Sequence, residues 1–502
     1  MHMDARSRGL RRTRSLRFCV LSLAAAAAWL LAQGDPLFAA PRTWIAGATV
    51  LPPEQKNSGR KLNVLVDGER IAAVATELPA DAAQDATVVN AEGLFLIPGL
   101  IDAHTHLQSV PGFTAVMQFD HPALVRAYRA QLPRSFLRYG YTTVIDLIVA
   151  DPDALAAFAQ APARPDFYTC GPALPVPGGY PTQNVPAQFL DRAFPNTVVE
   201  PKDAGGSSAH TPEAAVARVK QDGGICIKTF FERGFGRDRN LPVPSAELFA
   251  GIVKAAHGAG LPVLLHASSI EAQRFGMDGG TDVFVHGLWN WGDLDRAPAV
   301  PDAAKEVLNR VVAHRTGYMP TMQVIGGLRL LYQPEYFDQP AVRRVVPKAL
   351  LDWYRTAEGR WFKDELAGGA SDAQMRGGLD RALWRVAETT RYLAQRDANF
   401  LFGTDTPSGP TPGNLPGLNG YLEMQRLVAA GVTLRQLFDA ATLNNARAFG
   451  LMEEVGTIEP GKRANLLLLK RSPLESVEAY DAIETLWIAG RRLDPGSLEA
   501  AE

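Results

Sequence analysis

The sequence predicts an α/β protein in which a (β/α)8, TIM-like barrel carries a small β-sandwich domain built from both chain ends. Two observations lead to this prediction. Short apolar runs alternate with helical stretches over residues 99–451, the pattern of parallel strands joined by helices. Patterns typical of short strands and tight turns occupy residues 41–98 and 452–502, on either side of that middle segment.

The composition is that of an ordinary globular protein. Of 502 residues, 46% are hydrophobic and 21% are charged, which excludes a fibrous or wholly disordered chain. The formal net charge of −2 argues against a nucleic-acid-binding protein. Three cysteines are too few for a disulfide-built scaffold, and we expect Cys170 and Cys226 to be small core residues.

The first 40 residues are typical of a signal peptide. Residues 1–17 contain six arginines, and residues 18–32 are apolar apart from one serine. This apolar run is too short to cross a bilayer comfortably, so we expect residues 1–40 to be removed and the mature chain to have no stable membrane insertion. The mature protein would then be periplasmic or secreted. The pair Arg11-Arg12 leaves twin-arginine export open, and a retained membrane anchor is the alternative.

Turn residues mark the strands at both ends of the chain. Asp67-Gly68 stands between two apolar runs, which is a strong hairpin signal. In the later segment Pro460-Gly461 and Gly490 mark turns around a buried strand at Leu466–Leu469. We therefore expect the two ends to meet in one small domain.

Eight apolar runs in the middle segment are candidate barrel strands. The stretch at about 323–378 is too long for a simple connection and is rich in aromatic residues, so we interpret it as a helical insertion over one barrel end. The candidate strands are Leu100–Ala103, Thr142–Ile148, Asp166–Cys170, Ile225–Thr229, Val263–His266, Val283–His286, Tyr318–Thr321 and Phe400–Gly403.

Histidines at strand ends predict a metal site. His104 and His106 are two apart in a strand, so their side chains point the same way, and two imidazoles at one point favour a transition metal. His266 and His286 each end another apolar run, at the place where a barrel strand passes into its loop. A single histidine at such a place is more often structural. Four histidines at the ends of three strands instead favour one shared metal site.

Asp405 and Lys228 extend this pattern. Asp405 follows the last candidate strand, where a carboxylate can bind metal and move protons, although a turn or cap residue is the alternative. Lys228 lies in the apolar run GICIKTFF. Burial would lower its pKa and free its amine as a nucleophile, whereas a lysine that reaches the barrel rim would stay charged.

These residues and the segments around them, taken in their order along the chain, resemble those of the amidohydrolase superfamily of metal-dependent hydrolases. The likeness is greatest to the branch that contains imidazolonepropionase-like proteins and metal-dependent prolidases. The matching segments are PGLIDAHTHL at 98–107, CIKTF at 226–230, AAHGAGLPVLLHA at 255–267, GGTDVFVHG at 279–287, LFGTDT at 401–406 and a closing stretch at 441–469.

The resemblance implies two divalent metal ions, for which zinc is the first expectation, and a carbamate on Lys228 that bridges them. A hydroxide between the metals would attack the substrate, and Asp405 would accept its proton and then protonate the leaving amine. The implied ligands are His104, His106 and Asp405 for the more buried ion, His266 and His286 for the second, and Lys228 for both.

The resemblance also marks residues that are not ligands. His257 matches a family position that binds no metal, and we interpret it as structural. Tyr180 stands in a loop where related sequences often have histidine. It is therefore a candidate substrate contact, with a packed loop aromatic as the alternative.

The function that the resemblance implies is hydrolysis of an amide bond by a secreted, binuclear enzyme acting on a small, dipeptide-like or N-acyl amino acid substrate. A lactonase or esterase would use the same site. A mononuclear deaminase would use one metal and no bridging lysine. A binding protein that had lost the chemistry would lack ligands, whereas this chain lacks none of the six. The sequence leaves a homo-oligomer open.

Overall fold

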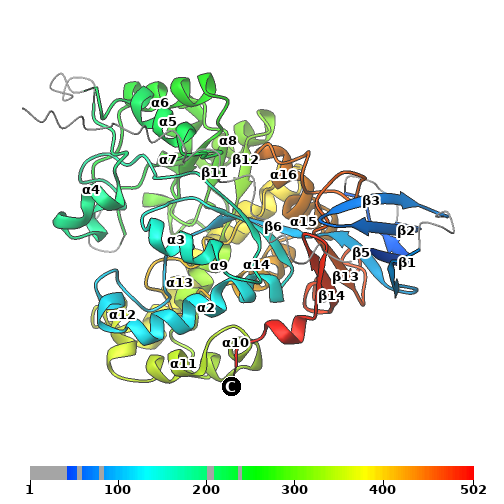
Figure 1. Ribbon diagram of the computed structural model, residues 1–502. Coiled ribbons are helices and arrows are strands. Elements are labelled where there is room, and N and C mark those ends of the chain that lie inside the picture. The colour runs from blue at the N-terminus through cyan, green and yellow to red at the C-terminus, as the bar shows by residue number, and fades with distance from the viewer. Residues whose placement is uncertain (1–41, 54–58, 78–83, 201–207, 236–239, 502) are drawn as a thin grey trace, which may run out of the picture. The chain divides into compact units, whose positions relative to one another are not determined.

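The computed structural model describes residues 42–53, 59–77, 84–200, 208–235 and 240–501. Within them parallel strands alternate with helices, and a second, largely antiparallel sheet joins the two ends of the described chain (Figure 1). The predicted α/β class is therefore confirmed. The predicted signal peptide lies outside the described residues.

One eight-stranded sheet takes strands from both ends of the described chain. Its central contact pairs β5 (Phe95–Pro98) with β13 (Leu466–Leu469) in antiparallel register. Figure 1 shows the blue strands of the first end beside the red strands of the other. The expected meeting of the two ends is thus confirmed. All eight strands belong to one hydrogen-bonded sheet, so a two-layer sandwich stays a prediction. The other strands are β1 (Thr43–Val50), β2 (Arg60–Asp67), β3 (Arg70–Ala75), β4 (Thr87–Asn90), β14 (Ile483–Ile488) and β15 (Arg491–Leu493).

The turns of this sheet lie where the sequence predicts them. Gly68 lies between β2 and β3, and Gly490 lies between β14 and β15. Gly490 has a φ of 72°, and a Cβ atom there would lie 1.9 Å from the carbonyl oxygen of Gly68. Only glycine fits this close approach of two turns.

Seven parallel strands form the middle of the described chain. They make two sheets, in the orders β6-β7-β8 and β12-β11-β10-β9. The expected eighth strand, Phe400–Gly403, differs from the other seven. It makes a single β-bridge, from Phe400 to Tyr318, rather than a ladder of several residue pairs. The strands are β6 (Leu100–Thr105), β7 (Tyr141–Asp146), β8 (Asp166–Thr169), β9 (Ile227–Phe230), β10 (Val263–His266), β11 (Val283–Val285) and β12 (Gly317–Met319).

Residues 399–402 connect the outer edges of the two parallel sheets. The backbone N–H of Leu401 donates to the carbonyl of Tyr318 at 3.0 Å, and that of Ala103 donates to the carbonyl of Phe402 at 3.0 Å. The side chain of Asn445 donates to the carbonyls of both Ile101 and Phe402. One amide therefore holds β6 and this segment together, which satisfies backbone groups that an open sheet edge would leave unpaired.

Hydrogen bonds also cross the other junction, between β8 and β9. Leu174 N–H donates to the carbonyl of Lys228 at 2.8 Å, and Ile225 N–H donates to that of Thr169 at 2.9 Å. One buried apolar cluster draws on both sheets and on residues 400–403; among its members are Ile101, Ile145, Leu264, Val285, Met319 and Leu401. The two sheets therefore share one interior.

Several helices begin at a residue that caps them. Thr211 accepts a hydrogen bond from Ala214 N–H at the start of α5 (Pro212–Gln221). Ser371 opens α13 (Asp372–Ala394) with a capping box. Further helices are α1 (Met117–Asp120), α2 (Pro122–Arg138), α3 (Pro152–Ala159), α4 (Leu190–Ala193), α6 (Ala246–Gly258), α7 (Ile270–Gly279), α8 (Asp302–Ala313), α14 (Leu418–Ala429), α15 (Leu434–Asp439) and α16 (Asn445–Ala448).

The segment at 323–378 is helical, as predicted. Tyr354 donates its hydroxyl hydrogen to the carbonyl of Pro111, and Trp361 donates its indole N–H to the carbonyl of Gly112, both at 2.8 Å. These bonds brace the loop that follows His106. The helices of this segment, before α13, are α9 (Met322–Leu330), α10 (Pro340–Arg343), α11 (Lys348–Tyr354) and α12 (Trp361–Ala367).

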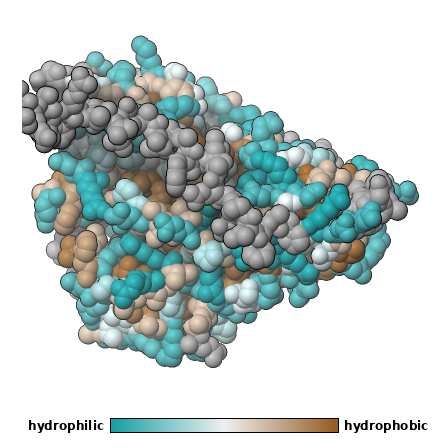
Figure 2. Space-filling view, in the orientation of Figure 1, coloured by the Kyte–Doolittle hydropathy of each residue, from teal (hydrophilic) through white to brown (hydrophobic). Residues whose placement is uncertain are grey.

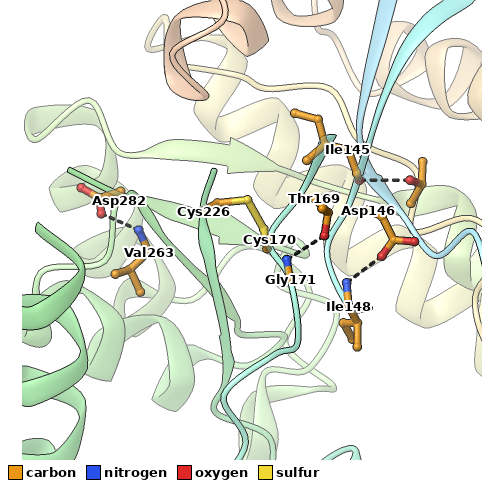
Figure 3. The surroundings of a disulfide bond; sticks show 10 residues. Ile145, Asp146, Ile148, Thr169, Cys170, Gly171, Cys226, Val263 and Asp282 are labelled. Atoms are coloured by element: carbon orange, nitrogen blue, oxygen red, sulfur yellow. Dashed lines mark hydrogen bonds between the residues drawn. A yellow bond between two sulfur atoms is a disulfide. The ribbon is translucent and has the colours of Figure 1, made fainter. Parts of the chain in front are cut away.

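A disulfide joins Cys170 to Cys226 inside the protein (Figure 3). Both cysteines are buried; Cys170 follows β8 and Cys226 precedes β9, so the bond crosses the junction of the two parallel sheets. The expectation that both are small core residues is confirmed, whereas their bond was not predicted. Their pairing depends on neighbouring strands whose cysteines are 56 residues apart in the sequence.

Polar and apolar side chains are interspersed on the face of the molecule in Figure 2. Most large apolar side chains of the described chain are instead buried in three clusters. No helix within the described ranges has both the length and the apolar character needed to span a bilayer.

Replacing Cys170 and Cys226 together by alanine should lower the free energy of unfolding by about 2–4 kcal/mol, because the cross-link restricts the unfolded chain. Calorimetry of the double variant should show a lower Tm than that of the wild type, and reductant should lower the Tm of the wild type only. An unchanged Tm, together with reactive thiols at both positions in the unfolded, unreduced chain, would contradict the bond.

Candidate metal centre

His104, His106 and Asp405 meet at the carboxyl end of β6. Asp405 Oδ1 lies 3.0 Å from His104 Nε2 and 2.7 Å from His106 Nε2. The potential ligand atoms of the three side chains lie within 4.8 Å of one another, close enough to hold one ion. The structure thus brings together three of the six predicted ligands, from segments that are 299 residues apart.

His286 and His266 continue this group as a row of imidazoles. The ring centroids are 5.3 Å apart for His106 and His104, 5.1 Å for His104 and His286, and 4.4 Å for His286 and His266. His266 is the last residue of β10, and His286 directly follows β11. All four predicted histidines therefore share one site.

Lys228 lies within β9 and is 1% exposed. Among the described residues no carboxylate forms an ion pair with it, and its Nζ lies 5.4 Å from the centre of the Phe230 ring. Its charge nevertheless acts on His104, His266 and His286, so it belongs to the same site. A buried, unpaired ammonium is unfavourable, and this favours the neutral amine.

Three residues at the strand ends have positive φ angles, a backbone conformation that residues other than glycine rarely adopt. The φ angles are 104° for His286, 57° for Asp405 and 47° for Thr321, which follows β12. Such positions cost about 1–3 kcal/mol each and persist where the surrounding structure fixes them, often at functional sites. Here the turn after each strand directs a side chain into the site.

Burial sets the protonation states of the site. It lowers the pKa of His104 to about 3 and that of Lys228 to about 7, in both cases against the opposing charge of Asp405. Burial likewise lowers the pKa of His266 and of His286. Burial alone would raise the pKa of Asp405, but His104 and His106 hold it well below its usual range. These are the neutral imidazoles and the ionised carboxylate that metal ions bind.

The donor set of this site fits divalent cations. Nδ1 of His104 is buried without a hydrogen-bond partner, which is costly unless another group binds it, and Nε2 lies 3.0 Å from Asp405 Oδ1. His286 bonds through Nδ1 to Thr321 Oγ1 at 2.7 Å, so its Nε2 is the nitrogen available to an ion. Imidazole and carboxylate ligands suit zinc and also accept manganese, iron or cobalt.

Asp102 is a site residue that the sequence reasoning missed. Its Oδ1 accepts backbone hydrogen bonds from His104 at 3.2 Å and Thr404 at 3.0 Å, and its Oδ2 accepts one from the Thr404 hydroxyl at 2.6 Å. Burial raises its pKa to about 7. Asp102 thus ties the backbone of His104 to that of the residue before Asp405. Its place in the segment IDAHTH, two residues before His104, was the available signal.

Tyr180 lies beside the row of imidazoles. Its ring centroid is 4.7 Å from that of His266, and it also contacts the rings of Phe230 and Phe235. Burial, with smaller effects from the charges of Asp405 and Glu232, raises the pKa of Tyr180. Its phenol is therefore protonated near the predicted ligands, as a hydrogen-bond donor to a substrate would have to be.

The other histidines of the described chain lie outside this group. His257 bonds to Asp282 at 2.8 Å and is largely exposed, in agreement with a structural role. His121 bonds to Glu358, and His210 bonds to the carbonyl of Thr197.

The sequence model of the amidohydrolase family matches residues 95–282 and 386–493. The chain belongs to the amidohydrolase family. The match spans more than half of the chain and includes five of the six predicted ligands; His286 falls in the gap, so only the structure places it at the site. Family membership makes this chain a metal-dependent hydrolase of the amidohydrolase superfamily.

Curated relatives match this amidohydrolase only locally. A dihydroorotase from Streptomyces coelicolor is 45% identical over 71 residues, which are 14% of each chain. A 5-methylthioadenosine/S-adenosylhomocysteine deaminase from Moorella thermoacetica is 33% identical over 116 residues, 22% of this chain and 26% of the deaminase. The chain therefore covers far less than two thirds of either relative.

Solved structures match over most of the chain at low identity. A Xaa-Pro dipeptidase with bound methionine has a TM-score of 0.62 and 18% identity, covering 90% of this chain and 100% of the dipeptidase. The ochratoxinase of A. niger has a TM-score of 0.64 and 19% identity, covering 91% and 98%. These likenesses show a shared fold.

Changing Tyr180 to phenylalanine should lower kcat/KM for an amide substrate by about 10-fold or more, because it removes one hydroxyl donor and keeps the ring against His266. Metal content should not change. Steady-state kinetics and metal analysis would check both, with Tyr392→Phe, on the outer helix α13, as the matched control. If the Tyr180→Phe variant had the kcat/KM of the wild type, the prediction would be wrong and Tyr180 would contribute only packing.

Proposed function

We propose that this chain is an exported, binuclear amidohydrolase that cleaves an amide bond in a peptide-like or N-acyl amino acid substrate. One observation carries the proposal: Asp405 and four imidazoles lie together at the ends of parallel strands, and the charge of Asp405 acts on the buried amine of Lys228. We also infer that the two parallel sheets and residues 399–402 close into a (β/α)8 barrel, whose active sites lie at this end of the strands. The hydrogen bonds across both junctions support that closure.

The six side chains divide into two sets. His104, His106 and Asp405 would hold one cation, and His266 and His286 the other. Lys228 would serve both ions after its neutral amine has added carbon dioxide to form a carbamate. Bound divalent cations supply a hydroxide nucleophile at neutral pH and polarise the substrate carbonyl. Asp405 would accept a proton and return it to the leaving amine.

The surroundings of the site favour a substrate with an apolar group beside the amide. Tyr180, Phe230 and Phe235 gather around His266, and Trp289 packs against His286 at a centroid distance of 4.9 Å. Structural neighbours include a Xaa-Pro dipeptidase and an ochratoxinase. A lactone or ester would meet the same groups, so substrate comparison separates these activities.

A mononuclear deaminase is the second candidate, favoured by two observations. The tightest group of potential ligands, His104, His106 and Asp405, has enough donors for one ion without Lys228. The local match to deaminases points the same way. The two candidates differ in what Lys228 does, because a mononuclear site has no use for a bridging carbamate.

Export to an oxidising compartment is part of the proposal. The buried disulfide is typical of periplasmic and secreted proteins and is rare in the cytosol. It supports the same conclusion as the arginine-rich, then apolar, N-terminus. Cell fractionation with mass determination of the mature chain would test it: we expect an extracytoplasmic protein that lacks about 40 residues.

The wild type should contain two divalent metal ions per chain and hydrolyse amides faster than lactones or aminopurines. Lys228→Ala should lose at least one ion and about 100-fold or more of the activity, since even an indirect partner of a ligand can contribute 10–100-fold. Lys220→Ala, which changes an exposed lysine on α5, is the matched control.

Metal analysis of both variants and a panel of dipeptides, N-acyl amino acids, lactones and 5′-methylthioadenosine would provide the readout. One ion per chain with an unmodified Lys228 and deamination activity would favour the second candidate. A wild type without bound metal, or a fully active Lys228→Ala variant, would overturn the proposal.

A further inference from the structure

Glu232 is a buried carboxylate that the proposed chemistry does not use. It lies two residues after β9, the strand that carries Lys228, and it is 5% exposed. No lysine or arginine of the described chain lies within ion-pair distance of it; its one close titratable partner is His266. The neighbouring Arg233 instead pairs with Glu271, at 2.9 Å. Burying a carboxylate without a paired cation costs free energy, so the position of Glu232 in the interior indicates a specific role.

The contacts of Glu232 aim its carboxylate at the ring of His266. Its Oε2 lies 3.3 Å from His266 Nε2 and accepts a hydrogen bond from the Ser268 hydroxyl at 2.6 Å. Its Oε1 accepts the backbone N–H of Gly234 at 3.0 Å. Both oxygens are therefore held by neighbours, and Oε2 is directed at one ring nitrogen of the imidazole.

This contact selects one tautomer of His266. A carboxylate accepts hydrogen bonds only, so His266 must carry its proton on Nε2, which leaves the lone pair of Nδ1 free. His286 is arranged in the opposite sense, because its Nδ1 bonds to Thr321 and its Nε2 is free. The two histidines assigned to the second cation thus each have one nitrogen bound to an oxygen and one available.

We infer that Glu232 is a positioning residue for the second cation: it fixes the ring and the tautomer of His266, and Ser268 fixes Glu232. This inference rests on the proposed function. Histidine ligands commonly donate their other N–H to a carboxylate, which orients the ring and strengthens the metal bond. A neutral side chain in place of Glu232 would weaken one cation site and leave the other intact.

Titration of the metal-free full chain with Zn²⁺, in competition with a chromophoric chelator, tests this inference. The wild type should bind two ions in two steps. Glu232→Gln should weaken one step by about 10–100-fold and leave the other within twofold, because only the group around His266 changes. Ser268→Ala should weaken the same step by less.

Glu271→Gln is the matched control, because it changes an exposed glutamate that bonds to Arg233 and leaves His266 untouched. Thermal unfolding of the metal-free proteins shows whether each variant folds. If Glu232→Gln does not fold, Ser268→Ala decides the matter alone, and unchanged affinity in both steps overturns the inference.

The possible failures are distinguishable. Two wild-type steps that Glu232→Gln leaves unchanged, or weakens equally, overturn the positioning role and leave the proposed function standing. A wild type that binds one ion or none overturns the binuclear proposal, and this inference with it.

Discussion

Burial of polar groups at the ends of the parallel strands is the constraint on which this site depends. Placing a charge away from water costs several kcal/mol unless another group compensates it. Asp405 is compensated by His104 and His106, whereas Lys228 has no ion-pair partner among the described residues. The imidazoles, one carboxylate and a lysine whose pKa is lowered to about 7 by burial form an incomplete set, which divalent cations would complete.

The rest of the fold holds these groups close together. Asp102 ties the backbone of His104 to the segment that carries Asp405, and Asn445 bonds that segment to β6 from a helix near the C-terminal end. Left-handed backbone at His286 and Asp405 turns the chain at the strand ends. The centre therefore depends on contacts between distant segments.

Gly403 shows how tightly this region is packed. A Cβ atom there would lie 2.7 Å from the Cβ of His104 and 2.8 Å from the sulfur of Met319. Cβ atoms in proteins do not approach other heavy atoms this closely. A larger residue at position 403 would therefore push β6 away from Asp405. The glycine in LFGTDT is thus required by packing beside the predicted metal ligands.

Much of the site could be predicted from the sequence, because strand periodicity places residues at strand ends. The grouping of four histidines, Lys228 and Asp405 follows from that logic, and the parallel order of the strands brings them to one edge. The inserted helices and the joining of both chain ends in one sheet were also predictable from local patterns.

Features that depend on three-dimensional neighbours were not predictable in this way. The Cys170–Cys226 bond needs two strands to be adjacent, and nothing in either apolar run indicates pairing. Glu232 follows its strand much as Asp405 does, but only the fold brings it to His266. The segment at 400–403 has the apolar pattern of a strand, yet it makes one bridge, with β12, before the chain turns at Asp405.

Anomalous X-ray diffraction at the absorption edge of the bound metal would show directly where the ions bind. We expect two anomalous peaks in crystals of the wild-type protein. One should lie among His104, His106 and Asp405, the other should lie beside His266 and His286, and electron density on Lys228 should extend between them. A single peak with an unmodified lysine, or peaks away from these side chains, would contradict this expectation.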